Sequence, residues 1–255
     1  ADAARLVKAS EMGLYQPSSS SQLNAEVPAN LRAPDGQWYA LTRRARVPIV
    51  NPEVVDPATI TSYDDLANPA LKGKLCLRNR KSPYNQSLVA DQIILRGEAA
   101  TAKWIRGMAN NVSQEFFPKD TPQVQAVGKG KCGVAVVNTY YVGRMLAGRK
   151  GADNKALAEK VKVVFPKPTH VNVSGAGVTA SSDNPQAALK LIEFLASPNA
   201  GKGYAAANLE YPVKGFGNNP ILRSWGTFKA DGVSVEQLGA KNKQAQQLMK
   251  DNGWK

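Results

Sequence analysis

Two adjacent tyrosines, Tyr140 and Tyr141, stand where an apolar run typical of a strand gives way to a helical pattern. The first turn of a helix exposes free N–H groups and the positive end of the helix dipole, which favour phenolates and nearby anions. Arg144 follows within one turn on the same face, so we expect its charge to lower the pKa of these phenols from about 10. Phenolate oxygen is a hard, charged donor, and a hard trivalent cation such as Fe(III) matches it.

A third tyrosine, Tyr84, lies at a second junction of the same kind, in the segment Ser82–Ser87. Junctions from strand to helix in one α/β lobe meet at the carboxyl edge of its sheet, where open α/β folds bind ligands. Three phenols are therefore expected to converge there. The alternative interpretation is that these tyrosines are packed aromatic side chains with hydrogen-bonded hydroxyls and no ligand.

The residues that catalysis would need are sparse. His170 is the single histidine, so any Ser-His-Asp or Cys-His mechanism must run through it, and no Gly-x-Ser-x-Gly elbow holds a nucleophile. The neighbouring carboxylates Asp64 and Asp65 are better explained as capping groups at a helix start. Residues Ser174–Gly177 carry the glycines of a tight turn without a phosphate-binding motif, and are at most a weak anion nest. We therefore predict that the protein is not an enzyme.

The charge balance is strongly basic, with 33 Lys and Arg against 20 Asp and Glu and a net charge of +13. Such an excess concentrates anions around the molecule, whether nucleic acid, an anionic membrane surface or a small ligand. The densest basic groups, around Arg44 and Arg80, lack the interleaved aromatics of a base-stacking platform, so no nucleic acid is expected as a partner. A basic nucleic-acid-binding domain is kept as the alternative from a different class. A second alternative is a protein that binds another small anion, using this charge and Ser174.

The two cysteines, Cys76 and Cys132, cannot supply a four-ligand zinc site with a single histidine, and they form no Cys-x-x-Cys motif. Each opens an apolar run typical of a strand. If those strands are neighbours, a disulfide is plausible and would place the protein in an oxidising compartment. Two buried free thiols are the equally open alternative.

The elements that would position these residues alternate between strands and helices along most of the 255 residues, which is typical of an α/β protein with largely parallel sheets. No run approaches the roughly 20 apolar residues of a membrane span, and the start at Ala1 suggests a processed or truncated chain. Expected strands cover 38–41, 47–50, 74–77, 134–137, 163–165 and 170–178. Expected helices cover 2–13, 85–95, 99–108, 121–128 with Thr121 as the cap, 140–146, 156–161, a helix opened by Asn184-Pro185, and a last helix with a capping box at Ser234 and Gln237.

With these motifs in view, the chain resembles the periplasmic ferric-ion-binding proteins of bacterial ABC iron importers. The most specific part is the Asn-x-Tyr-Tyr motif after a strand, at Asn138–Tyr141. Further stretches similar to the family lie along essentially the whole chain, at Asp2–Leu6, Leu41–Arg46, Tyr63–Ala67, Tyr84–Ala90 and His170–Val178.

The resemblance implies an α/β, periplasmic-binding-protein-like fold of two lobes, with Fe(III) held in the cleft between them. The metal ligands would be the tyrosinates of Tyr84, Tyr140 and Tyr141, with the charge of Arg144 close to the metal. Asn138 and Ser174 would contact a bound anion or water. The oxidation state in use, Fe(III) or Fe(II), and the need for a synergistic anion stay open.

The family also implies a periplasmic monomer that captures iron or a ferric chelate and delivers it to an ABC permease in the inner membrane. Residues 1–50 and 170–228 would form the first lobe and 51–169 the second, with 229–255 as a C-terminal helix packing on the second lobe. Crossovers near 47–51 and 170–178 would act as hinge strands. Family members have a further stretch before the segment like Asp2–Ala4, which carries the opening strands of the first lobe and commonly a His or Tyr ligand. We therefore expect an incomplete first lobe, in a fragment or a natural short variant.

Overall fold

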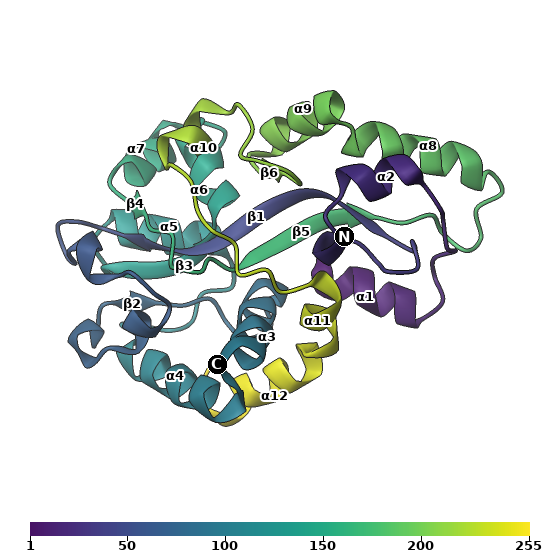
Figure 1. Cartoon of the computed structure of the whole chain (residues 1–255). Helices are drawn as coiled ribbons and strands as arrows, with labels where there is room; N and C mark the ends of the chain where they lie inside the picture. Colours follow the sequence, from purple (N-terminus) through teal and green to yellow (C-terminus); the bar gives the residue numbers. More distant parts are fainter.

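One long strand, β1 (Tyr39–Val50), belongs to both β-sheets in the computed structural model of residues 1–255 (Figure 1). Its first half pairs antiparallel with β5 (Val171–Ala176) and β6 (Tyr211–Pro212). Its second half pairs antiparallel with β3 (Val134–Asn138) and β4 (Lys162–Val163). The short β2 (Leu75–Cys76) lies parallel to β3 at the edge.

Two predictions about this region are wrong. The expected strands 38–41 and 47–50 are one continuous strand, and antiparallel rather than parallel pairing dominates, with β2 and β3 as the parallel pair. The charged residues Arg43–Arg46 separate the two apolar runs, and arginines are rarely buried without partners. Here Arg44 and Arg46 are buried within the strand and their guanidiniums are paired, so the strand continues through them.

The helices form three groups around this strand. In Figure 1 one group surrounds β3 and β4, a second lies over the β5 and β6 end, and a third lies beneath, where α12 packs against α3 and α4. The helices are α1 (Ala3–Glu11), α2 (Ser21–Glu26), α3 (Pro83–Arg96), α4 (Glu98–Asn111), α5 (Asp120–Gly128), α6 (Thr139–Leu146), α7 (Ala152–Glu159), α8 (Pro185–Ala196), α9 (Pro198–Asn208), α10 (Pro220–Ser224), α11 (Val235–Ala240) and α12 (Asn242–Asp251). No helix combines the length and the apolar character needed to cross a bilayer.

Helix ends follow the predicted capping chemistry in some places and not in others. Asp2 caps α1 by accepting from the Arg5 N–H at 3.1 Å, and Ser234 with Gln237 forms the expected capping box. Thr121 is not the cap of α5, because the helix already begins at Asp120, whose side chain is turned inward to arginine partners. The last helix is divided at Lys241 into α11 and α12.

A disulfide joins Cys76 to Cys132, with 5.9 Å between the two Cα atoms. It links β2, which contains Cys76, to the segment that leads into β3. The two predicted strands that carry the cysteines are therefore neighbours. Both side chains are buried among Val124, Val127 and Val142. The disulfide interpretation is confirmed and that of two free thiols is excluded.

Reduction of this disulfide should lower the free energy of unfolding by about 4 kcal/mol, because the bridge closes a loop of about 56 residues in the unfolded chain. Urea unfolding with and without dithiothreitol measures the change. A Cys76→Ala/Cys132→Ala variant should match the reduced protein and should not respond to the reductant. An unchanged unfolding midpoint after complete reduction would contradict the prediction.

Candidate metal centre

The three tyrosines of the two strand-to-helix junctions come together. The Tyr140 hydroxyl donates to the Tyr84 hydroxyl oxygen at 3.2 Å. The ring of Tyr141 stacks on that of Tyr140, with 4.4 Å between the ring centroids. Tyr140 is buried, whereas Tyr84 and Tyr141 are half-buried. The predicted convergence of phenols is therefore present as a cluster of three hydroxyls and aromatic rings.

The two junctions meet because the strands before them are neighbours. Tyr84 lies in the first turn of α3, shortly after β2, and Tyr140 and Tyr141 lie in the first turn of α6, directly after β3. Since β2 and β3 are parallel, their carboxyl ends lie at one edge of the sheet, which brings the two helix starts together. Pro83 at the start of α3 fixes the local backbone angle without losing a helical hydrogen bond.

The buried guanidinium of Arg46 is hydrogen-bonded to both strand-to-helix junctions. Arg46 donates to Asn85 Oδ1 at 3.0 Å, to Asn138 Oδ1 at 3.1 Å and to Asp120 Oδ2 at 3.0 Å. Asp120 also accepts from Arg78, at 3.3 Å, and from the Asn138 backbone N–H, at 3.2 Å. Sequence reasoning missed Arg46 and Asp120 as supports of the site. An arginine within an otherwise apolar strand pattern was the signal available, because such a residue needs a buried partner.

Positive charge surrounds the phenols. The guanidinium carbons of Arg44, Arg46 and Arg78 lie 5.5, 5.9 and 5.2 Å from the ring centroid of Tyr84. That of Arg144 lies 4.6 Å from the ring centroid of Tyr140. A cation over a ring face is attracted by the ring quadrupole, so these contacts hold the rings in place.

The predicted lowering of the phenol pKa by Arg144 is wrong for the metal-free protein. Burial raises the pKa of Tyr140 above its ordinary value, and the neighbouring Tyr141 and Tyr84 add to the rise. Burial raises the pKa of Tyr141 as well. Arg144 does not reverse this, because its guanidinium lies over the ring of Tyr140 and makes no hydrogen bond to the hydroxyl. Both phenols are therefore neutral at physiological pH until a cation replaces their protons.

The weaker candidates, Asn138 and Ser174, are connected to this cluster through arginine side chains. Asn138 uses its Oδ1 atom to accept from Arg46, and its buried Nδ2 donor has no partner. Ser174 lies farther off, on β5. Its Oγ atom accepts from Arg44 Nη1 at 2.6 Å and donates to Glu210 at 3.1 Å. Arg44 links Ser174 to the ring of Tyr84, and its Nε donor is buried without a partner. Two buried donors among these side chains thus have no hydrogen-bond partner.

Comparison with known proteins gives consistent results. Residues 3–232 match the family described as bacterial extracellular solute-binding protein. Iron uptake protein A1 of Synechocystis is 42% identical over 100% of this chain and 72% of its own length. Trichodesmium FutA, also named IdiA, in complex with iron and citrate, superposes with a TM-score of 0.95 at 39% identity over 100% of this chain and 82% of its own. A ferric binding protein of Bordetella has a TM-score of 0.92 at 37% identity over 99% and 81%. The likeness confirms the predicted α/β, two-lobe periplasmic-binding-protein fold.

The raised phenol pKa can be measured by ultraviolet titration of the metal-free protein through the ordinary tyrosine range, about pH 8 to about pH 12. The Tyr140→Phe variant should lose no titration step near the ordinary tyrosine value, because burial keeps the Tyr140 phenol protonated there. In denaturant the same variant should lose one tyrosine titrating near the ordinary pKa of about 10. A native curve that loses a step near that value would contradict the prediction.

Proposed function

The chain belongs to the bacterial extracellular solute-binding protein family, and on that premise we propose that it binds Fe(III) through the phenolates of Tyr84, Tyr140 and Tyr141 and delivers it to an ABC permease. The observation that carries the proposal is the contact of the Tyr84 and Tyr140 hydroxyls, with Tyr141 stacked alongside. Family members are transport proteins, and binding and release of iron need no catalytic step.

The raised phenol pKa favours a highly charged cation. Three phenolates carry three negative charges, which one Fe(III) ion neutralises in a partly buried place, whereas a divalent ion leaves one charge uncompensated. Burial makes uncompensated charge costly, so the cluster should prefer Fe(III) to Fe(II). Phenolate oxygen is also a hard donor, and a trivalent ion such as Fe(III) is the harder of the two iron ions.

The surrounding charges support an anion bound together with the iron. Arg44, Arg46, Arg78 and Arg144 surround the rings, and the carboxylates of Asp120 and Glu210 offset two of these four charges. Once three phenolates neutralise Fe(III), the site keeps positive charge. The unpaired donors, Arg44 Nε and Asn138 Nδ2, suit the oxygen atoms of a small carboxylate or of water. We propose that such an anion completes the coordination of the metal, with Ser174 acting through Arg44.

The proposed lobes follow the pairing of β1. Residues 1–50 and 170–228 form the first lobe and 51–169 the second, with β1 and β5 as hinge strands between them. The pairing of β1 with β5 and β6 at one end, and with β3 and β4 at the other, supports two lobes joined through β1, with the crossover between Ala45 and Arg46. Packing of α12 against α3 and α4 supports the return of its residues, Asn242–Asp251, to the second lobe, whereas α11 packs mainly against α1 of the first lobe.

The disulfide supports a periplasmic location, because disulfides persist in oxidising compartments. The protein would work there as a monomer and meet the permease at the inner membrane. The basic surface, with a net charge of +13, would attract anionic ferric chelates and concentrate them around the cleft.

Titration of the metal-free protein with ferric citrate tests the proposal. We expect a visible charge-transfer band from phenolate to iron, and Tyr141→Phe should weaken iron binding at least about 100-fold and diminish the band, since it removes a ligand. Tyr84→Phe and Tyr140→Phe should act in the same direction. Tyr204→Phe, on α9 and away from the cluster, is the matched control and should bind iron like the wild type.

Two other outcomes would each identify a different function. Absence of the band at every iron level, together with thermal stabilisation by citrate alone, would replace the iron function with binding of a small anion. Steeply salt-dependent binding to any DNA, without the band, would favour the nucleic-acid alternative.

A further inference from the structure

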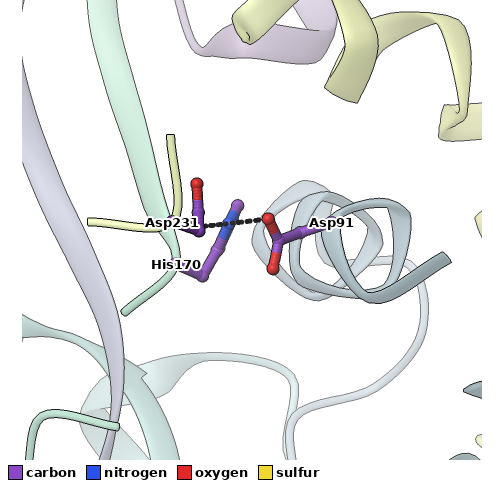
Figure 2. A group of neighbouring side chains, drawn as sticks. All are labelled: Asp91, His170 and Asp231. Carbon is purple, nitrogen blue, oxygen red and sulfur yellow. Dashed lines mark ion pairs between the residues drawn. The ribbon is translucent and has the colours of Figure 1, made fainter. Parts of the chain in front are cut away.

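A second group of potential ligands is buried away from the phenols. Figure 2 shows Asp91 of α3 and Asp231, from the segment before α11, on either side of His170, which directly precedes β5. His170 Nδ1 lies 3.5 Å from Asp91 Oδ1 and 3.6 Å from Asp231 Oδ2. The side chains of Asp91 and His170 are each 1% exposed and that of Asp231 is 4% exposed. All three ligand atoms lie within 4.8 Å of one another.

The outward-facing atom of each side chain is held by a hydrogen bond. His170 Nε2 lies 3.2 Å from Ser87 Oγ, and Ser87 Oγ accepts from Asn172 Nδ2 at 2.7 Å. Asp91 Oδ2 accepts from Gln92 Nε2 at 2.9 Å, and Asp231 Oδ1 accepts from the Val233 N–H at 2.8 Å. The three atoms that face one another have no hydrogen-bond partner. Ligands of protein-bound metals are oriented in this way, with one atom fixed by a neighbour and the other free for the metal.

The spacing fits a shared cation better than direct hydrogen bonds. An N–H···O bond normally joins atoms about 2.7–3.2 Å apart, shorter than both distances found here. Nitrogen and oxygen ligands of a tetrahedral zinc ion lie about 2.0–2.2 Å from the metal, which puts them about 3.3–3.6 Å from one another. The imidazole–carboxylate distances fall in that range.

The charges also favour a cation. Two carboxylates beside a neutral imidazole leave two negative charges on buried side chains, and such charges are costly unless compensated. The guanidinium of Arg46 does not compensate them, because it is hydrogen-bonded to Asp120, Asn85 and Asn138. Burial alone would lower the pKa of His170, but the two carboxylates outweigh it and raise the pKa to about 9. A proton on His170 cancels one of the two charges, and a divalent metal ion cancels both.

We propose that Asp91 Oδ1, His170 Nδ1 and Asp231 Oδ2 bind one divalent cation of the zinc class, at a site distinct from the phenol cluster. One imidazole and two carboxylates suit zinc, with water as the fourth ligand, and suit Ca²⁺ or Mg²⁺ less because those ions prefer all-oxygen sites. The ion would tie α3 to the start of β5 and to the segment before α11. It would act as a structural metal and does not depend on the proposed iron function.

Asp231 is the member of this group that lies nearest to a surface cavity. This residue lines a surface cavity of about 660 Å³ whose walls include Phe165 and Phe228. Lys167 and Lys229 line the same cavity and repel cations, so entry into the folded protein should be slow. The test therefore supplies the metal during refolding as well as afterwards.

Because the chain has a single histidine, nitrogen NMR of the imidazole reads the site in the wild-type protein without any substitution. Iron-free protein is refolded from chelator-treated, denatured material with and without one equivalent of ZnCl₂. We expect zinc to shift the Nδ1 resonance to a metal-bound position at neutral pH and to leave Nε2 protonated. A doubly protonated imidazole at neutral pH in the presence of zinc would overturn the proposal and identify an ion triad instead.

Zinc content after gel filtration provides a second readout. Wild-type protein and the control Asp183→Asn, an exposed aspartate, should each retain about one zinc per chain, and Asp231→Asn should bind at least about tenfold more weakly. Equal retention by Asp231→Asn, or no retention by the wild type, would overturn the proposal. If Asp231→Asn does not fold, Asp91→Asn is used in its place. The NMR measurement is made on the wild-type protein and does not depend on either variant.

Discussion

The buried ion pair between Arg46 and Asp120 is the contact on which the arrangement of the phenols depends. Moving a guanidinium and a carboxylate out of water costs several kcal/mol for each ion, and the pair is tolerated because side-chain amides and backbone groups satisfy the remaining hydrogen-bonding atoms. Those amides belong to Asn85, next to Tyr84, and to Asn138, just before α6. The distance between the two junctions is therefore set within the folded chain, before any ligand arrives, which lowers the entropy lost on binding.

Two opposing effects then determine how the phenols behave. Nearby guanidiniums favour negative charge, but they lie over ring faces, while burial acts directly on the hydroxyl oxygens and keeps Tyr140 and Tyr141 protonated. The stronger effect at rest is burial. A metal ion changes the balance because it supplies charge at the oxygen itself, so metal binding and proton release occur together. The cluster is thus arranged to exchange protons for a cation and does not hold free phenolates.

The sequence allowed the convergence of the phenols to be predicted, because a general rule places strand-to-helix junctions of parallel strands at one edge. It could not determine whether Cys76 and Cys132 pair, since that depends on which strands are neighbours. The continuity of β1 was missed because Arg44 and Arg46 find their partners far along the chain, at Glu210 and Asp120. The grouping of His170 with Asp91 and Asp231 was missed for the same reason, because the three residues lie far apart in the sequence. Local patterns indicate elements and junctions, whereas compensation of buried charge depends on long-range packing.

The membership of β1 in both sheets has a mechanical consequence. Ala45 pairs with Val171 in one sheet, and the next residue, Arg46, pairs with Asn138 in the other. The strand therefore passes from one sheet to the other across a single peptide unit, and a change of angle between the sheets must be absorbed as torsion in the backbone around it. Strands are compliant in twist, with neighbouring strands commonly rotated by about 10–35°, so such torsion is inexpensive. Guanidiniums are anchored on both sides of that peptide unit, Arg44 by Glu210 and Arg46 by Asp120, so the short stretch of backbone between them is where the torsion is taken up.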